Sequence, residues 1–115
     1  MLIINETKNE VLFEEAKFAR NFFERLKGLM FKKDISEKEA LIFENCKQIH
    51  TFFMKFNIDV IYLDKEFKVI KLEENVVPFR ICKWVNKATY IIEIKSGLIK
   101  KKKIEIGDKI KFIER

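Results

Sequence analysis

The chain has 115 residues, of which 48% are hydrophobic and 37% are charged, and twelve of them are phenylalanine. This length suits a single domain over residues 1–115, and the apolar share excludes an intrinsically disordered chain. No apolar run approaches the roughly 20 residues that a membrane-spanning helix needs, and the N-terminus lacks the basic start of a signal peptide. We therefore expect a soluble, cytoplasmic protein with no membrane partner.

The formal net charge of +6 is unevenly distributed, because Lys100 to Lys103 alone supply four positive charges. The remainder is close to balance, so the composition does not predict a broad nucleic-acid-binding face. The lysine run is most typical of a solvated surface, and it would attract phosphates only weakly and in a salt-sensitive way. Nucleic-acid binding through residues 100–103 is therefore the last of the functional alternatives.

The first twenty residues predict two short strands, "LII" and "VLFEE", joined by the polar stretch "NETKN". The period then changes to that of an amphipathic helix of about three turns. The apolar stripe of this helix consists of Phe18, Phe22, Leu26, Leu29 and Met30. The serine of "SEKEA" precedes Glu39 by three residues, which is a capping-box pattern for a single helical turn.

From residue 40 onward the period is mostly two, which predicts strands at "ALIFE", "IHTFFM", "IDVIYLD" and "FKVIKLE", with "DKEF" as a tight turn. "ATYIIEIK" alternates cleanly and places Glu93 on its polar face. "SGLIKKKK" predicts a short turn of helix, and "KIEIGDKIKFIE" resumes alternation with Ile106 among the inward residues. The fold class is therefore mainly β (α+β): a small β-barrel or sandwich with one packed amphipathic helix and short helical turns.

His50 is the only histidine in the chain and lies within "IHTFFM". As part of a strand it would lie on a largely apolar face, which favours a buried histidine hydrogen-bonded to a backbone carbonyl. The alternative is a histidine at the rim of a cavity that acts as a donor or general base, with Asp59 orienting it. Strand parity puts these two residues on opposite faces, although a bulge at "KFN" would reset that parity.

The two cysteines, Cys46 and Cys82, form no paired motif, and their spacing alone does not argue for a disulfide. Cys46 and His50 would share a metal ion only on a helix, because four residues of strand separate them by about 13 Å. We therefore expect no metal and no cofactor. A catalytic triad of Cys82, His50 and Asp59 is possible, but such a composition arises easily by chance.

"VVPFR" ends a strand at Pro78, the only proline, so we expect Arg80 on a loop at one end of the sheet. There it is either a solvated surface arginine or an anchor for an anion, since guanidinium matches carboxylate and phosphate. Glu93 is expected to form a structural ion pair with Arg80 or Arg25 rather than to act in catalysis.

Seven short motifs, in order, resemble one family over nearly the whole chain: "RLKGLMF", "IHTFFM", "IDVIYLD", "KVI", "VPFR", "IIEI" and "IGDKI". This order is similar to that of the domain of unknown function 192 family. The resemblance implies a compact, mainly β fold of barrel type with small helices, and it implies no established activity. Asn57 and Phe79 stand where the family pattern has proline and tryptophan. The matching positions are Arg25, Gly28, Leu29, Met30, His50, Thr51, Met54, Asp59, Pro78, Arg80, Glu93, Gly97, Gly107 and Asp108.

These patterns favour a small binding module that holds a small polar or anionic ligand, or a partner protein segment, at one end of the barrel. Its ligand-binding residues are predicted to be His50, Thr51, Asp59 and Arg80. The first alternative is a hydrolase-like enzyme with His50 as general base and Asp59 as orienter, and the second is weak nucleic-acid binding through residues 100–103. The residues with structural roles are predicted to be Arg25, Gly28, Pro78, Glu93, Gly107 and Asp108.

Overall fold

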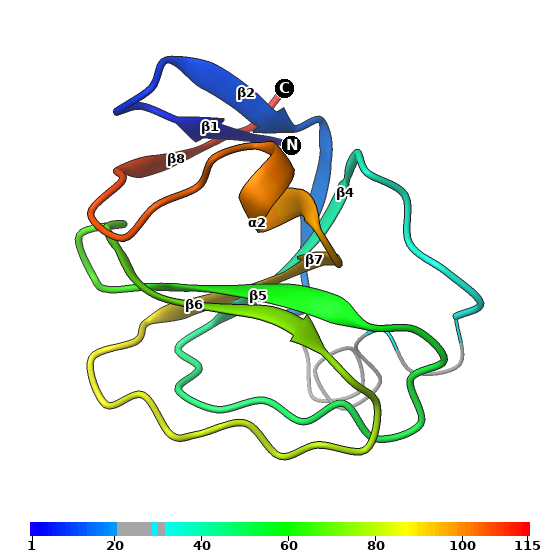
Figure 1. Cartoon of the computed structure of the whole chain (residues 1–115). Coiled ribbons are helices and arrows are strands. Elements are labelled where there is room, and N and C mark those ends of the chain that lie inside the picture. The colour runs from blue at the N-terminus through cyan, green and yellow to red at the C-terminus, as the bar shows by residue number, and fades with distance from the viewer. Residues whose placement is uncertain (21–28, 30–31) are drawn as a thin grey trace.

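The computed structural model describes residues 1–20, 29 and 32–115 and contains two β-sheets with one short helix, α2, beside them (Figure 1). The smaller sheet has the order β2-β1-β8 and is antiparallel. The larger sheet has the order β3-β4-β7-β5-β6, in which β3 and β4 run parallel and the other neighbours antiparallel. The elements are β1 Leu2–Asn5, β2 Glu10–Phe13, β3 Glu15–Phe18, β4 Glu39–Glu44, β5 Ile58–Leu63, β6 Val69–Val76, β7 Tyr90–Lys95, α2 Leu98–Lys101 and β8 Ile110–Ile113.

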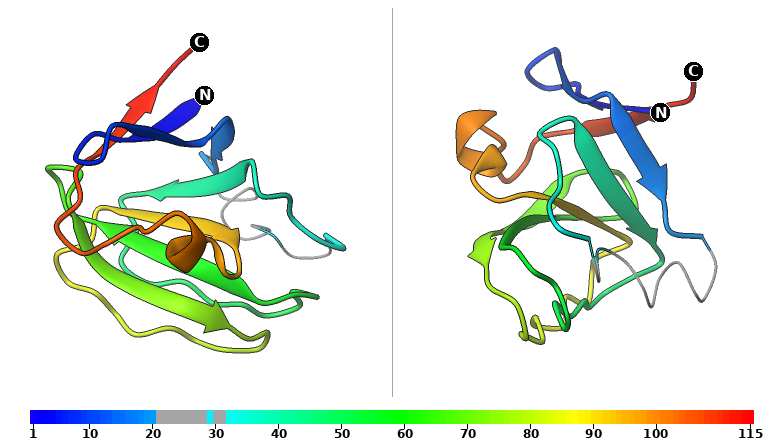
Figure 2. Two further views of the ribbon diagram at one scale, coloured as in Figure 1. Left: turned by 45° about the horizontal axis from the view of Figure 1, so that its top comes forward. Right: turned by 90° about the vertical axis from the view of Figure 1, so that its right-hand side faces the viewer.

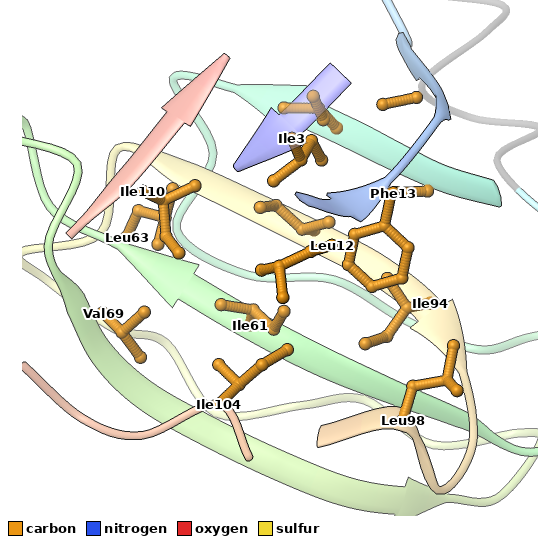
Figure 3. Close-up of a cluster of buried hydrophobic side chains, with 14 of the residues drawn as sticks. Ile3, Leu12, Phe13, Ile61, Leu63, Val69, Ile94, Leu98, Ile104 and Ile110 are labelled. Carbon is orange, nitrogen blue, oxygen red and sulfur yellow. The ribbon is translucent and has the colours of Figure 1, made fainter. Parts of the chain in front are cut away.

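The two sheets form an open sandwich, so the mainly β prediction is confirmed in its sandwich form and the sheets do not close into a barrel (Figure 2). Alternate residues of the central strands, such as Ile61 of β5 and Ile94 of β7, point toward the smaller sheet and α2 (Figure 3). We call this cluster the sandwich core. Its buried members are Ile3, Leu12, Phe13, Ala16, Ala40, Ile42, Ile61, Leu63, Val69, Ile92, Ile94, Leu98, Ile99, Ile104 and Ile110.

The opposite face of the larger sheet is also buried, and every residue of β5 is inaccessible to solvent. Here Val60 and Tyr62 pack against the buried side chains of two long loops. We call this second cluster the loop-side core, and it also contains Leu29, the one described residue of the predicted helical stripe beyond Phe18. A sheet covered on both faces explains why its central strands carry apolar residues at consecutive positions.

Most strands lie where the sequence pattern predicts them, and "SGLIKKKK" forms α2 as expected. "IHTFFM", however, is not a strand: His50 makes only an isolated bridge with Ile81, and the chain turns at Phe53, which has a φ of 62°. "SEKEA" is not a helical turn either. The Ser36 N–H donates to Glu39 Oε2 at 3.1 Å, as in a capping box, but Glu39 begins β4.

Ile106 and Phe18 also lie in surroundings other than those predicted. Ile106 is 67% exposed rather than inward, because the chain turns at Gly107, whose φ is 96°. Phe18 ends strand β3 instead of beginning a helix, and most of the predicted helix falls on residues 21–28 and 30–31, outside the described residues.

A buried polar cluster joins the two ends of the chain within the smaller sheet. Asn5 Nδ2 donates to Asp108 Oδ2 at 2.8 Å, and the same oxygen accepts the Glu105 N–H at 2.9 Å. Burial alone would raise the pKa of Asp108, but these hydrogen bonds and the nearby Lys8 ammonium hold the pKa below its ordinary value. The carboxylate therefore stays ionised and fixes the turn before β8.

Candidate functional site

Two long loops cover the loop-side core: residues 45–57 connect β4 to β5, and residues 77–89 connect β6 to β7 (bottom of Figure 1). They run side by side and are tied by backbone hydrogen bonds. The Thr51 N–H donates to Arg80 O at 2.8 Å, and the Cys82 N–H donates to Ile49 O at 3.0 Å. We call these segments the paired loops.

Thr51 is the central tie between the paired loops, and it is fully buried. Its hydroxyl donates to Val77 O at 2.7 Å and accepts the Arg80 N–H at 2.9 Å. Its own carbonyl accepts the Phe79 N–H at 2.9 Å. Thr51 therefore fixes the loop backbones in place, and its side chain is not available at the surface.

The paired loops carry most of the exposed large hydrophobic side chains of the described residues, five of seven. Such a concentration is unusual, because scattered single exposures are the norm and a group marks an interaction surface. The side chains are Phe53, Val77, Phe79, Ile81 and Trp84.

Two of these residues have strained backbones. Phe53 and Phe79 both have a φ of 62°, a left-handed conformation that bulky side chains rarely adopt, and their ring centroids lie 5.8 Å apart edge to face. Strain of this kind persists only where the surroundings impose it, as the Thr51 contacts do here, and it gathers at functional sites. The rings are thus held outward by a fixed backbone.

The charge of the paired loops is of one sign. They contain five lysine and arginine residues and no aspartate or glutamate. Lys47 turns inward, and its Nζ donates to Asn86 O at 2.7 Å and Ala88 O at 2.8 Å. The other four are exposed: Lys55, Arg80, Lys83 and Lys87. The loop surface is therefore both apolar and basic.

His50 lies within this surface and is half-buried. Its Nδ1 accepts the Phe52 N–H at 3.1 Å, and its ring lies 4.9 Å from the Phe52 ring. Because Nδ1 is an acceptor, the neutral ring carries its proton on Nε2. The bond runs from a backbone N–H to the ring, the reverse of the expected bond to a carbonyl.

Asp59 belongs to the other face of the sheet. Its Oδ1 accepts the Asn75 N–H at 2.8 Å, and its Oδ2 accepts the N–H groups of Gly97 and Ile99, each at 3.0 Å. The carboxylate therefore anchors the start of α2 to β5. Of the predicted ligand residues, the structure brings His50, Thr51 and Arg80 together; between His50 and Asp59 the described contacts include no hydrogen bond.

Glu93 lies on β7 beneath the paired loops, with Leu41 and Val60 as its register partners on the neighbouring strands. It is 2% exposed, and its Oε1 has no hydrogen-bond partner among the described residues. Burial raises its pKa to about 8, so the carboxyl is mostly protonated at neutral pH. The structure contains no ion pair with Arg80, and Arg25 lies outside the described residues.

Cys82 lies near this carboxyl, and Tyr62 lies near Cys82. The Tyr62 hydroxyl donates to Glu73 Oε1 at 2.7 Å, and burial together with this bond raises the pKa of the tyrosine. Cys46 and Cys82 are free, buried thiols, and burial raises the pKa of Cys82. A protonated, buried thiol is a poor nucleophile, so these contacts give no support to a cysteine triad.

The sequence predicted His50, Thr51 and Arg80 as ligand residues, which stays a prediction, and it did not predict the exposed rings of Phe53, Phe79 and Trp84. One usable signal was present in the sequence: residues 45–57 and 77–89 carry basic residues and no acidic ones. That asymmetry of charge would have pointed to the same pair of loops.

Comparisons with known proteins agree with the fold. The model of the DUF192 family, described as "Uncharacterized ACR", matches residues 3–112. A UPF0127 protein of Pyrococcus horikoshii is 41% identical, over 96% of this chain and 98% of the relative, and one of Pyrococcus abyssi is 37% identical over 97% of each. A crystal structure of a protein of unknown function from Novosphingobium aromaticivorans superposes with a TM-score of 0.82 at 23% identity, covering 96% of this chain and 82% of that one. In the described part of the chain, no helix has the length and apolar character needed to cross a membrane.

Proposed function

The chain belongs to the DUF192 family, and we propose that it is a binding module whose ligand site is the outer surface of the paired loops. The ligand is anionic and also carries apolar surface. Arg80 supplies charge, His50 contributes a polar ring, and Thr51 positions both loops from beneath. Asp59 supports the scaffold and does not contact the ligand. A cytoplasmic location stays a prediction from the sequence.

One observation carries this proposal: apolar side chains are exposed on loops whose backbone is fixed and whose charge is entirely positive. Phe79 is 64% exposed although its φ of 62° is unfavourable for a bulky residue. A side chain held outward in a strained conformation contributes little to stability, so a binding role accounts for it better than packing does.

The alternatives find less support. A hydrolase-like site needs His50 oriented by a carboxylate, whereas both oxygens of Asp59 are taken by backbone donors. Nucleic-acid binding through residues 100–103 is less favoured because two of these four lysines contact other side chains of the chain. Lys101 Nζ lies 2.7 Å from Glu37 Oε1, and Lys102 Nζ lies 5.4 Å from the centre of the Phe13 ring.

The test uses anilinonaphthalene sulfonate, an anionic aromatic dye that fluoresces in apolar surroundings. We expect the folded protein to bind the dye, and we expect Arg80→Gln or Phe79→Asn to weaken binding by about tenfold. Ile106→Asn is the matched control, because Ile106 is equally exposed at the Gly107 turn, away from the paired loops.

Circular dichroism of each variant must match the parent protein, because partly unfolded states also take up this dye. Equal dye binding by the parent and both loop variants would contradict the proposal. A loss in the Ile106 variant as large as in the loop variants would do so too.

A further inference from the structure

We infer that the ligand of the paired loops is an acidic segment of another protein that presents leucine, phenylalanine or similar side chains between its carboxylates. This inference rests on the proposed function, and it names the chemical class of the partner.

The first step is that the paired loops contain no acidic residue and that their exposed basic residues form no ion pair within the described part of the chain. Elsewhere some described lysines are paired and others, such as Lys65 and Lys111, are not. Lys95 Nζ lies 3.2 Å from Asp34 Oδ2, and Lys71 Nζ lies 3.6 Å from Glu73 Oε1. By contrast, the four exposed basic residues of the paired loops make no ion pair with any carboxylate in the described part of the chain. An acidic partner would supply the missing carboxylates and would be steered toward this surface.

The second step is the mixture of side chains that the partner meets. Val77 and Ile81 are aliphatic and lie in the same loop as Phe79 and Trp84. Aliphatic groups pack well against the side chains of a peptide, but they offer no flat face to a nucleobase. A surface built for stacking bases is dominated by aromatic faces instead.

The third step concerns the orientation of the rings. The rings of Phe53 and Phe79 meet edge to face at 69°, so each ring covers part of the other. Successive bases of a single strand need separate open faces. An irregular surface of ring edges and branched side chains fits a peptide better than it fits a single-stranded nucleic acid.

A second copy of this chain is the other candidate occupant. In a symmetric dimer the same patch meets itself, so the paired loops of two copies would bring four exposed positive charges against four others. Such a like-charge interface is unfavourable unless counter-charges lie within it. The charge of the loops therefore favours a different, acidic protein.

The backbone of the paired loops is already held in one conformation without a bound partner. The Thr51 hydroxyl and the backbone bonds between the loops hold Phe79 and Ile81 in place. A surface that is already ordered loses little conformational entropy when it binds, which favours a short and flexible peptide as partner.

The experiment selects peptides from a random displayed library against the full chain, with counter-selection against the double variant Arg80→Glu, Lys83→Glu. We expect the enriched peptides to combine aspartate or glutamate with large apolar residues. The most enriched peptide is then synthesised and titrated against the protein, with the fluorescence of Trp84 as the signal. Trp84 is the only tryptophan and is 62% exposed within the paired loops, so its emission reports binding there directly.

We expect the double variant to weaken the synthesised peptide by at least about tenfold. The matched control is Lys100→Glu, Lys103→Glu, which makes the same change of charge at two exposed lysines, one in α2 and one just after it, and should leave the affinity unchanged. Enrichment of neutral or basic peptides, or no enrichment, would overturn the inference. Tighter binding of oligothymidylate than of the peptide, or a dimer that occludes Trp84, would also overturn it.

The two proposals fail in different ways. If the dye binds at the paired loops while no acidic peptide does, the loops remain a binding site and only the class of partner is wrong. If the loop variants change neither dye binding nor peptide binding, the paired loops are not the binding surface, and both the proposed function and the proposed partner are wrong.

Discussion

Asp59 and Glu93 are buried carboxyl groups on opposite faces of the larger sheet, and their surroundings are opposite in kind. Asp59, on the sandwich side, accepts three backbone N–H groups. Glu93, on the loop side, leaves Oε1 without a hydrogen-bond partner among the described residues, and its pKa is raised to about 8. Buried polar groups normally have hydrogen-bond partners, so Asp59 is typical in this respect and Glu93 is not.

A second contrast concerns the exposure of apolar side chains. The sandwich core is mostly aliphatic and closed, and Asn5 and Asp108 are hydrogen-bonded to each other. Left-handed phenylalanines occur on both sides, but Phe67 packs against the sandwich core, whereas Phe53 and Phe79 in the paired loops are exposed. Proteins depart from good local structure mainly where function requires it, and this contrast is one reason why we propose the loop side as the binding face.

The largest expected loss of stability comes from a substitution of Asp59 on the sandwich side. Asp59→Ala removes three charge-assisted hydrogen bonds and leaves the Ile99 N–H buried without a partner, so we expect the free energy of unfolding to fall by about 4 kcal/mol. Chemical denaturation measures it. Glu74→Ala, an exposed change on neighbouring β6, serves as control and should cost less than about 0.5 kcal/mol. A loss under about 1 kcal/mol for the Asp59 variant would mean that the carboxylate does not hold α2.

The second prediction concerns pH on the loop side. The folded pKa of Glu93 is about 8, above the ordinary value of 4.5. Its contribution to stability is therefore fully present below the ordinary pKa and is lost as the pH rises through the folded pKa. Between about pH 5 and about pH 8 we expect the parent protein to lose about 3 kcal/mol of unfolding free energy through this group.

Glu93→Gln keeps the shape of the side chain and removes its ionisation. The pH-dependent loss should therefore disappear from this variant, as measured by denaturation across the same pH range, while Glu74→Gln should behave like the parent. Parallel curves for the parent and Glu93→Gln would show that Glu93 is ionised or paired in the folded protein.

The sandwich side was predicted from the sequence better than the loop side, for physical reasons. Strands such as β5 carry a continuous apolar run whose meaning is plain once they are buried on both faces. "IHTFFM" has the composition of a strand, but Phe53 turns the chain without the glycine or asparagine that normally marks a left-handed residue. The local sequence therefore does not predict the turn at Phe53.

The sequence pattern placed Glu93 on a polar face, whereas the side chain is buried, and the reason is related. A single acidic residue in an alternating strand predicts a solvent face, whereas β7 is the middle strand of the larger sheet and has no such face. Its burial depends on the paired loops, one of which, residues 45–57, is distant in sequence. The position of Arg80 beyond Pro78 was predicted because proline ends strands by its own covalent geometry.

The third prediction loosens the paired loops without changing their shape. Thr51→Val removes the hydroxyl and leaves Val77 O and the Arg80 N–H without that partner, so we expect a loss of about 2 kcal/mol in unfolding free energy. Thr89→Val is the matched control, since the Thr89 hydroxyl has no hydrogen bond among the described contacts, and it should cost less than about 0.5 kcal/mol. Equal effects from the two changes would mean that Thr51 does not tie the loops.

The smallest effect has the opposite sign and separates stability from binding. Phe79 has a φ of 62°, which costs an ordinary L-residue about 1–2 kcal/mol and costs asparagine less. Its side chain is 64% exposed, so little packing is lost when it is replaced. We therefore expect Phe79→Asn to raise the free energy of unfolding by about 1 kcal/mol, as measured by denaturation, while it weakens dye and peptide binding.

Ile81→Asn is the control for this last prediction, because Ile81 is also 64% exposed but its φ is not positive. It should weaken binding without any gain in stability, since it relieves no strain. If Phe79→Asn is destabilising, the ring contributes more to packing against Phe52 and Phe53 than its exposure indicates. If it is stabilising and still binds as the parent does, the strained ring has no part in binding, and the contrast between the two faces would reflect packing alone.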